Sequence, residues 1–151
     1  MDLRRGFSLV ELLVALAVLA IILALSTGLS FPYYRRQQLL TATSVAVSEL
    51  RQAQAEAESQ LDDASHGVKA QTTGMVRFTG SSYAGRTTSK DKTSLFSFPV
   101  SVSGTTEFVF TKGGVAPTAA GTLTLTLDDQ AADIAVSSYG LLTVTRRTVT
   151  P

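Results

Sequence analysis

The pattern of hydrophobic and polar positions divides the chain into an apolar stretch, an amphipathic stretch and a region of alternation. Residues 12–25 are apolar without interruption, and Glu11 is the only charged residue between positions 7 and 34. As a helix, residues 12–31 would rise about 30 Å, which matches the hydrocarbon core of a bilayer. The stretch is rich in Leu and Ala and apolar on every side. It therefore predicts a helix that spans a membrane or lies in an apolar bundle.

The flanks of this segment predict its orientation. Arg4 and Arg5 precede it, which keeps a short N-terminus on the cytoplasmic side and places the rest of the chain outside. A cleaved secretory signal is the alternative, because residues 15–17 read Ala-Leu-Ala. That tripeptide lies inside the apolar run rather than after it, and Glu11 is unusual for such a signal. The pattern therefore favours a retained helix.

Pro32 marks the expected end of the membrane segment, and an amphipathic helix is predicted after it, over residues 32–62. Apolar residues recur there every three or four positions, which gives a stripe that packs on a sheet. The stripe consists of Leu39, Ala42, Ala46, Leu50, Ala53, Ala57 and Leu61. Asp62, Asp63 and Gly67 are expected to end the helix.

From Thr72 the chain is rich in Ser and Thr, and these alternate with apolar residues in the two-residue period of β-strands. Glycines separate the segments, and the short connections leave no room for crossover helices, so the sheet should be antiparallel. Six strands are predicted, at residues 75–78, 95–98, 108–110, 122–127, 134–136 and 141–144. The fold class is α+β: a long N-terminal helix, half membrane and half amphipathic, packed on a C-terminal antiparallel sheet.

The composition limits the chemistry of the chain. It has 151 residues, a net charge of +1, no Cys and a single His. These numbers fit one domain and exclude disulfides, cysteine nucleophiles and whole-chain binding of polyanions. We expect no enzyme activity, no catalytic residue and no cofactor, with His66 solvated beyond the helix end. Asp128, Asp129 and Asp133 are expected in one loop, as a solvated acidic turn rather than a metal site, because their spacing matches no standard calcium loop.

Two basic groups are candidates for nucleic-acid contacts. Arg86, Lys90 and Lys92 lie in a loop near a tyrosine, and Arg146 and Arg147 lie near the C-terminus. Adjacent residues on a strand point to opposite faces of the sheet, so the two arginines should not act together. A solvated, solubilising surface is the preferred interpretation, and DNA binding is the alternative.

Residues 6–13, Gly-Phe-Ser-Leu-Val-Glu-Leu-Leu, follow a short basic leader and open the apolar segment. This arrangement resembles the signal of type IV prepilins and type II secretion pseudopilins. The resemblance implies that a prepilin peptidase cleaves after Gly6 and methylates the new amine of Phe7. It also implies that Glu11 pairs with the methylated amine of an adjacent subunit during assembly. A buried carboxylate needs such a partner, because its insertion costs about 2.5–3.5 kcal/mol.

The resemblance implies further features. The segments would be a leader at 1–6, a transmembrane or filament-core helix at 7–31, an amphipathic helix at 32–62 and a β-rich head at 63–151. Partners would be the peptidase, other pilin subunits and, indirectly, a platform membrane protein and an assembly ATPase. The protein would first be a single-pass inner-membrane protein with an extracytoplasmic head, and then a filament subunit.

The C-terminal half loosely resembles H-type minor pseudopilins and the fimbrial-T group, which favours a minor subunit. Some fimbrial-T-like pilins bind DNA through a Gly-Arg-x-Arg pattern, which is absent after Gly140. A minor pilin whose head binds DNA or a surface is the alternative function. The sequence leaves open whether the filament is a pilus or a secretion pseudopilus.

Overall fold

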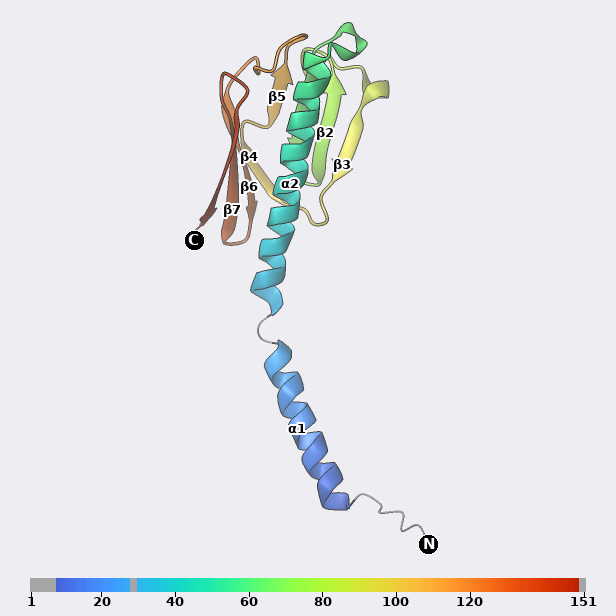
Figure 1. Cartoon of the computed structure of the whole chain (residues 1–151), viewed down its shortest axis with the longest axis vertical. Coiled ribbons are helices and arrows are strands. Elements are labelled where there is room, and N and C mark those ends of the chain that lie inside the picture. The colour runs from blue at the N-terminus through green and yellow to red at the C-terminus, as the bar shows by residue number, and fades with distance from the viewer. Residues whose placement is uncertain (1–7, 28–29, 150–151) are drawn as a thin grey trace. The chain divides into compact units, whose positions relative to one another are not determined.

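The computed structural model describes residues 8–27 and 30–149 (Figure 1). The chain divides into two compact units between Arg35 and Arg36. The first unit contains helix α1 (Leu9–Thr27), and each unit is described by itself below.

Helix α2 (Ser30–Glu58) begins earlier than the sequence predicted and continues into the second unit. Pro32 lies in its first turn, where the missing N–H breaks no bond within the helix. Pro32 therefore marks the start of α2 rather than a kink within it.

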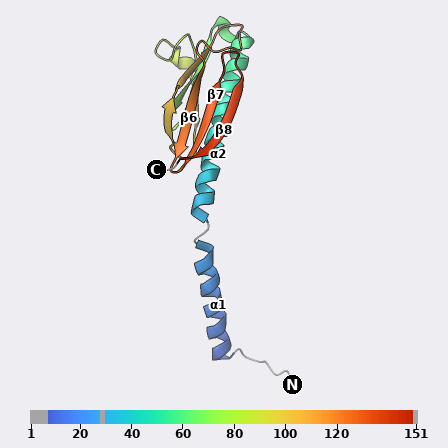
Figure 2. The ribbon, with the colours of Figure 1, turned by 90° about the vertical axis from the view of Figure 1, so that its left-hand side faces the viewer.

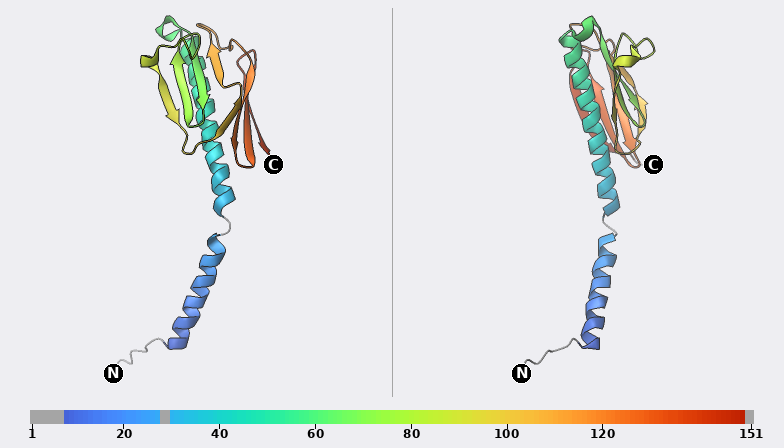
Figure 3. Two further views of the ribbon diagram at one scale, coloured as in Figure 1. Left: turned by 180° about the vertical axis from the view of Figure 1, so that it is seen from behind. Right: turned by 90° about the vertical axis from the view of Figure 1, so that its right-hand side faces the viewer.

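The second unit contains two four-stranded antiparallel sheets, in the orders β3-β2-β1-β5 and β4-β6-β7-β8. Their strands are β1 (His66–Gln71), β2 (Gly74–Thr79), β3 (Lys92–Leu95), β4 (Ser101–Gly104), β5 (Glu107–Phe110), β6 (Gly121–Leu127), β7 (Gln130–Val136) and β8 (Leu142–Thr148). The two further views in Figure 3 show both sheets on one side of α2. The predicted α+β class with antiparallel pairing is confirmed, although the strands form two sheets instead of one.

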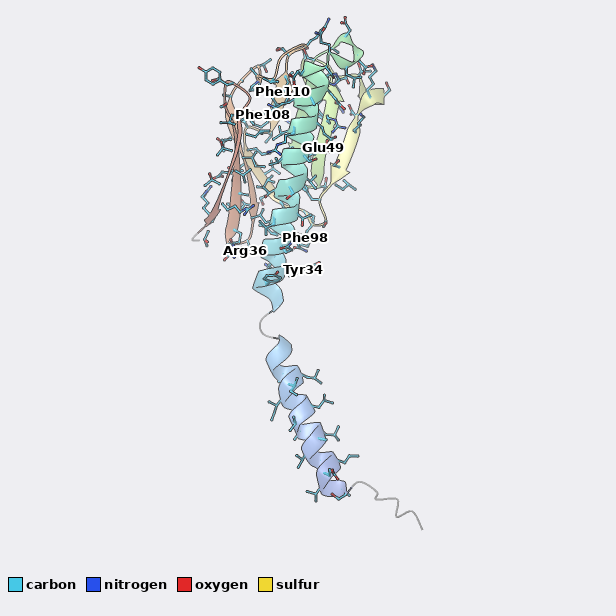
Figure 4. The ribbon with its side chains drawn as sticks, viewed as in Figure 1. Tyr34, Arg36, Glu49, Phe98, Phe108 and Phe110 are labelled. Carbon is cyan, nitrogen blue, oxygen red and sulfur yellow. The ribbon has the colours of Figure 1, made fainter. Side chains whose placement is uncertain are left out.

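The amphipathic stripe of α2 forms the centre of the core. Six of its seven predicted members are almost completely buried: Leu39, Ala42, Ala46, Leu50, Ala53 and Ala57. They pack in one cluster with residues from both sheets, including Phe108 and Phe110 of β5, which Figure 4 labels beside the helix. The alanines let the helix backbone approach the strands closely, while the large phenylalanines fill the space opposite.

The seventh stripe residue, Leu61, is 45% exposed, so its predicted place in the core is wrong. The α-helix ends at Glu58, because Gln60 adopts a left-handed conformation with φ of 56°. Residues 61–63 then form a short 3₁₀ turn. Leu61 therefore leaves the helical register that would have buried it.

Strand positions differ from the prediction in several places, and β7 begins four residues before the predicted strand at 134–136. Strands β1 and β4 were not predicted, because neither shows a clear alternation of apolar and polar residues. Strand β3 ends at Leu95, so the predicted continuation to residue 98 is wrong. The Phe96 N–H donates to the Thr73 carbonyl instead, and Pro99 has no N–H for a ladder. Strand β8 is longer than predicted and includes both arginines near the C-terminus.

Gly67, expected to end a helix, lies inside β1 against the ring of Phe78. A Cβ atom at this position would lie 2.4 Å from the Phe78 ring and 2.8 Å from the Phe108 carbonyl oxygen. Glycine is therefore required by close packing between β1 and its neighbours.

Candidate functional site

The start of α1 is a capped helix end. The Glu11 N–H donates to Ser8 Oγ at 3.2 Å, and the Leu12 N–H donates to the Ser8 carbonyl at 3.2 Å. Ser8 is thus the N-cap residue and Glu11 lies in the first turn, in the Ser-x-x-Glu spacing of a capping box. The carboxylate of Glu11 sits where the positive end of the helix dipole stabilises it.

Apart from Glu11, the described side chains of α1 are apolar, and they are exposed. Leu9, Val10, Leu12 and Leu13 are between 56% and 76% exposed, and the apolar residues of the next two turns are exposed as well. Among the described residues, no helix combines the length and the hydropathy of a membrane span. The predicted transmembrane helix at residues 7–31 is therefore not confirmed.

Arg86, Lys90 and Lys92 are paired with carboxylates, and the prediction that all three lie in one loop is wrong for Lys92, which is the first residue of β3. Arg86 Nε lies 2.8 Å from Asp91 Oδ2, and its guanidinium stacks 3.7 Å from the ring centre of Tyr83. The hydrogen bond with Asp91 raises the pKa of Arg86 above its ordinary value. Lys90 and Lys92 reach Asp62 at 2.9 Å and Glu56 at 3.1 Å, respectively. These three cations therefore form ion pairs within the chain.

The two C-terminal arginines point to opposite faces of their sheet, as predicted. Arg147 lies on the outer face and binds Asp133 Oδ2 at 2.8 Å. Arg146 pairs in register with Ala132, whose side chain is completely buried, and so lies on the face turned to α2. The arginines therefore do not form a joint contact surface.

The three aspartates predicted to share one loop are separated by the fold. Asp128 and Asp129 form the β6–β7 turn, whereas Asp133 is inside β7 and bonded to Thr124 and Arg147. The expectation of a single loop is thus wrong for Asp133. The hydrogen bonds from Arg147 and then Thr124 hold the pKa of Asp133 below its ordinary value. No group of three or more metal-binding side chains occurs in the described part of the chain.

Comparison with known proteins identifies the N-terminal region. Residues 1–27 match the model of the prokaryotic N-terminal methylation motif. The chain carries a type IV prepilin-like signal. Gly6 and Phe7 lie within the matched segment but outside the described residues, while Ser8 and Glu11 form the first turn of the helix that the motif opens. Neither the comparison with curated proteins nor that with solved structures gave a match.

The motif implies processing by a prepilin peptidase and assembly with other pilins. It is the motif of membrane-anchored proteins that become subunits of surface filaments, a structural class that is typically not enzymatic. The α+β head, with an N-terminal helix packed on antiparallel sheets, is pilin-like. The signal and the fold of the head therefore agree.

The structure also shows a buried group of charged residues that the sequence did not single out. The head of the prepilin-like chain contains a buried ionic network between α2 and β2. Arg77 Nη1 lies 2.5 Å from Glu49 Oε2, and Arg77 Nε lies 3.1 Å from Glu56 Oε2. Ser94 Oγ donates to the other oxygen of Glu49 at 2.7 Å. Glu49 is a charged residue at a core position of α2, next to the predicted stripe, which was the available signal.

His66 belongs to the same region, and its predicted exposure to solvent is wrong. It lies in β1 with 1% of its surface exposed. Its Nε2 donates to the Leu61 carbonyl at 2.8 Å, and its Nδ1 lies 3.4 Å from Glu56 Oε2. These contacts tie the start of β1 to the end of α2, so His66 has a structural role.

Proposed function

We propose that this protein is a structural subunit of a type IV pilus or a type II secretion pseudopilus. The observation that carries the proposal is the capped first turn of an apolar helix within the methylation motif, with Glu11 at its N-terminal end. A long helix with exposed apolar side chains needs cover from other molecules, and identical or similar helices in a filament core supply it.

The proposed roles follow the motif. Gly6 is the last leader residue, and Phe7 becomes the methylated N-terminus after cleavage. Glu11 then lies four residues beyond a new positive charge, in an apolar environment where a carboxylate requires a partner. A neighbouring subunit's methylated amine is such a partner, and this pairing would set the register between adjacent helices. Ser8 would hold the first turn in the conformation that presents the Glu11 carboxylate.

Before assembly, α1 is proposed to anchor the protein in the inner membrane with the head outside. The apolar surface of its described side chains supports this placement. A platform membrane protein and an assembly ATPase would then move the subunit from the membrane into the filament. The minor role favoured by the loose H-type resemblance stays a prediction, which the number of copies per filament would test.

The first experiment is the mass and N-terminal peptide of the protein purified from native membranes. An N-methylated Phe7 is the expected start, with the six leader residues removed. A start near Ala17 or later would identify a secreted soluble domain and would contradict the filament proposal.

The second experiment tests Glu11 in the full chain. We expect Glu11→Ala to be processed and membrane-associated as before. The amount of this variant found in sheared filaments should fall at least tenfold. Glu58→Ala is the matched control, because this exposed glutamate of α2 lies in the other unit and has no described ion-pair partner. Normal incorporation of the Glu11 variant would contradict the proposed pairing.

A further inference from the structure

A groove of about 500 Å³ lies between α2 and the edge strand β8 on the surface of the head. Figure 2 shows β8 beside α2 at this edge. The groove is lined by α2 residues, among them Val47, Ser48, Arg51 and Ala55, and by Val144 and Arg146 of β8. We call it the basic groove, because an arginine enters it from each side.

The two arginines of the basic groove are unusual in the charge distribution of the head. The other Lys and Arg residues from position 69 to 147 each have a carboxylate within 4 Å. Within the described residues, Arg51 and Arg146 have none, and Arg36 is the one further cation of the head without a partner. Two unpaired arginines therefore lie in one groove, and no carboxylate of the described residues neutralises them.

The register of the sheet explains why Arg146 reaches the groove. Leu142, Val144 and Arg146 alternate on the face of β8 that continues the core, opposite Val136, Ile134 and Ala132 of β7. Because β8 is the last strand of its sheet, this face is not fully covered by α2, and Val144 remains 37% exposed. Arg146 therefore lies on an otherwise apolar face, beside the open edge of the sheet.

The head also carries an exposed carboxylate, whose charge is opposite to that of the two arginines. Asp129 lies in the two-residue turn between β6 and β7, a narrow projecting tip. Its carboxylate accepts a hydrogen bond from the neighbouring Gln130 at 3.3 Å and forms no ion pair with a described cation. The β6–β7 turn therefore presents an exposed carboxylate at the tip of a two-residue hairpin.

We propose that the basic groove of one subunit binds the β6–β7 turn of a second copy of this chain, with Arg51 and Arg146 pairing with Asp129. This inference rests on the proposed filament function. It identifies one surface through which the heads of two subunits contact each other. The valines and Ala55 of the groove cover the turn and lower the local dielectric, which strengthens the ion pair. Charge pairing across such a contact fixes the register of the two heads more than it adds affinity.

A protein carboxylate fits the groove better than a nucleic-acid backbone. Residues 36–151 contain ten Lys or Arg and ten Asp or Glu, so the head has no net field that would attract a polyanion. Nucleic-acid binding draws on several phosphate contacts, whereas the basic groove supplies two cations on a partly apolar floor. One or two carboxylates are enough to neutralise these two cations.

The absence of Cys from the chain allows a clean cross-linking test in the full-length protein. Two differently tagged copies are produced together, one with Ser48→Cys in the groove and one with Thr148→Cys, which lies opposite Gln130 beside the turn. A short bismaleimide should join them in membranes and in sheared filaments. Ser81→Cys, exposed in a loop after β2, replaces Ser48→Cys in the control and should give no heterodimer.

Charge reversal then tests the ion pair itself. Arg51→Glu with Arg146→Glu should lower the yield of cross-linked heterodimer at least tenfold, and Asp129→Arg in the other copy should restore it. Arg36→Glu, which reverses an unpaired cation outside the groove, should leave the yield unchanged. An equal yield with the double reversal would overturn the proposal.

The outcomes separate this inference from the proposed function. Filaments with a methylated Phe7 but no cross-link would overturn the head contact and leave the filament role standing. A chain that is neither cleaved nor assembled would overturn both. Retention of a DNA duplex by the detergent-solubilised chain, lost on double reversal and without cross-linking, would assign the groove to phosphate and overturn the proposed occupant.

Discussion

Arg77 of β2 and Glu49 of α2 form an ion pair of 2.5 Å between the helix and the sheet, and each residue is only 7% exposed. The guanidinium also contacts Gln52 and Glu56, which lie one helical turn apart on α2. The pair thus joins the helix to the sheet at one defined register. Removing the two charges from water costs free energy. The ion pair therefore specifies that register as much as it stabilises the fold.

Removing one partner of this pair should destabilise the head strongly. We expect Glu49→Ala to lower the free energy of unfolding by about 3 kcal/mol, because Arg77 would be left buried with only part of its charge compensated. Urea unfolding of the full chain in detergent, followed by tyrosine near-UV circular dichroism, measures the change. Glu58→Ala, an exposed residue of the same helix, should change it by less than about 0.5 kcal/mol. Equal effects of both substitutions would contradict the prediction.

The alanines of the α2 stripe should not tolerate larger residues. Ala46 has no exposed surface, so Ala46→Leu would force α2 away from the sheets and cost about 1–3 kcal/mol of stability. Ala55→Leu adds the same atoms on the exposed side of the helix and serves as the control. Thermal unfolding of the two variants in the same detergent compares them, and a Tm for Ala46→Leu at or above that of the control would refute the packing argument.

Ser8 should stabilise the first turn of α1. Ser8→Ala removes the acceptor of the Glu11 N–H, which is worth about 1 kcal/mol at an N-cap. Hydrogen exchange at the Glu11 and Leu12 amides should therefore accelerate several-fold in the variant. Ser8→Asp, which keeps an acceptor at the cap, should stay close to the original exchange rates, and unchanged exchange in the alanine variant would show that the cap is not formed.

Arg147 should control the titration of Asp133. Its hydrogen bond lowers the pKa of Asp133 in the folded state, followed in importance by the bond from Thr124. The interaction therefore stabilises the fold at pH values above the unfolded pKa of about 3.9, and this contribution is lost as the pH falls through the lower folded pKa. Arg147→Gln should raise the pKa of Asp133 toward its ordinary value.

Carboxyl NMR titration of Asp133 measures this shift. Arg146→Gln is the matched control, because Arg146 is the neighbouring residue but lies on the opposite face of the sheet. The control should leave the pKa of Asp133 where it is. A pKa that does not move in Arg147→Gln would show that the ion pair is absent in solution.

Local patterns predicted much of the head correctly. The period of the α2 stripe identified six buried residues, from Leu39 to Ala57, because a helix with one apolar face packs that face against the sheet. Alternation located β6, where three leucines face the core and three threonines face outward. The alternation rule also placed Arg146 and Arg147 on opposite faces before their surroundings were known.

Local patterns were insufficient where a residue's environment came from distant segments. His66 reads as a polar residue after a helix, yet β2 and β5 pair on either side of its strand and bury it. The place of Glu49 next to the apolar stripe indicates burial, but only the position of Arg77 on β2 supplies its ion-pair partner. The division of the strands into two sheets depends likewise on pairings between residues far apart in the chain.

The sequence by itself determined the signal, because the methylation motif depends on the order and spacing of residues within positions 1–27 and needs no distant neighbour. It also determined the helix stripe and the fold class, which follow from the periods of local structure. The tertiary structure alone decided which charges are paired and which are free. Ion pairing depends on distances between segments that are remote in the chain, so Arg147 is neutralised by Asp133 while Arg146 and Arg51 share an open groove.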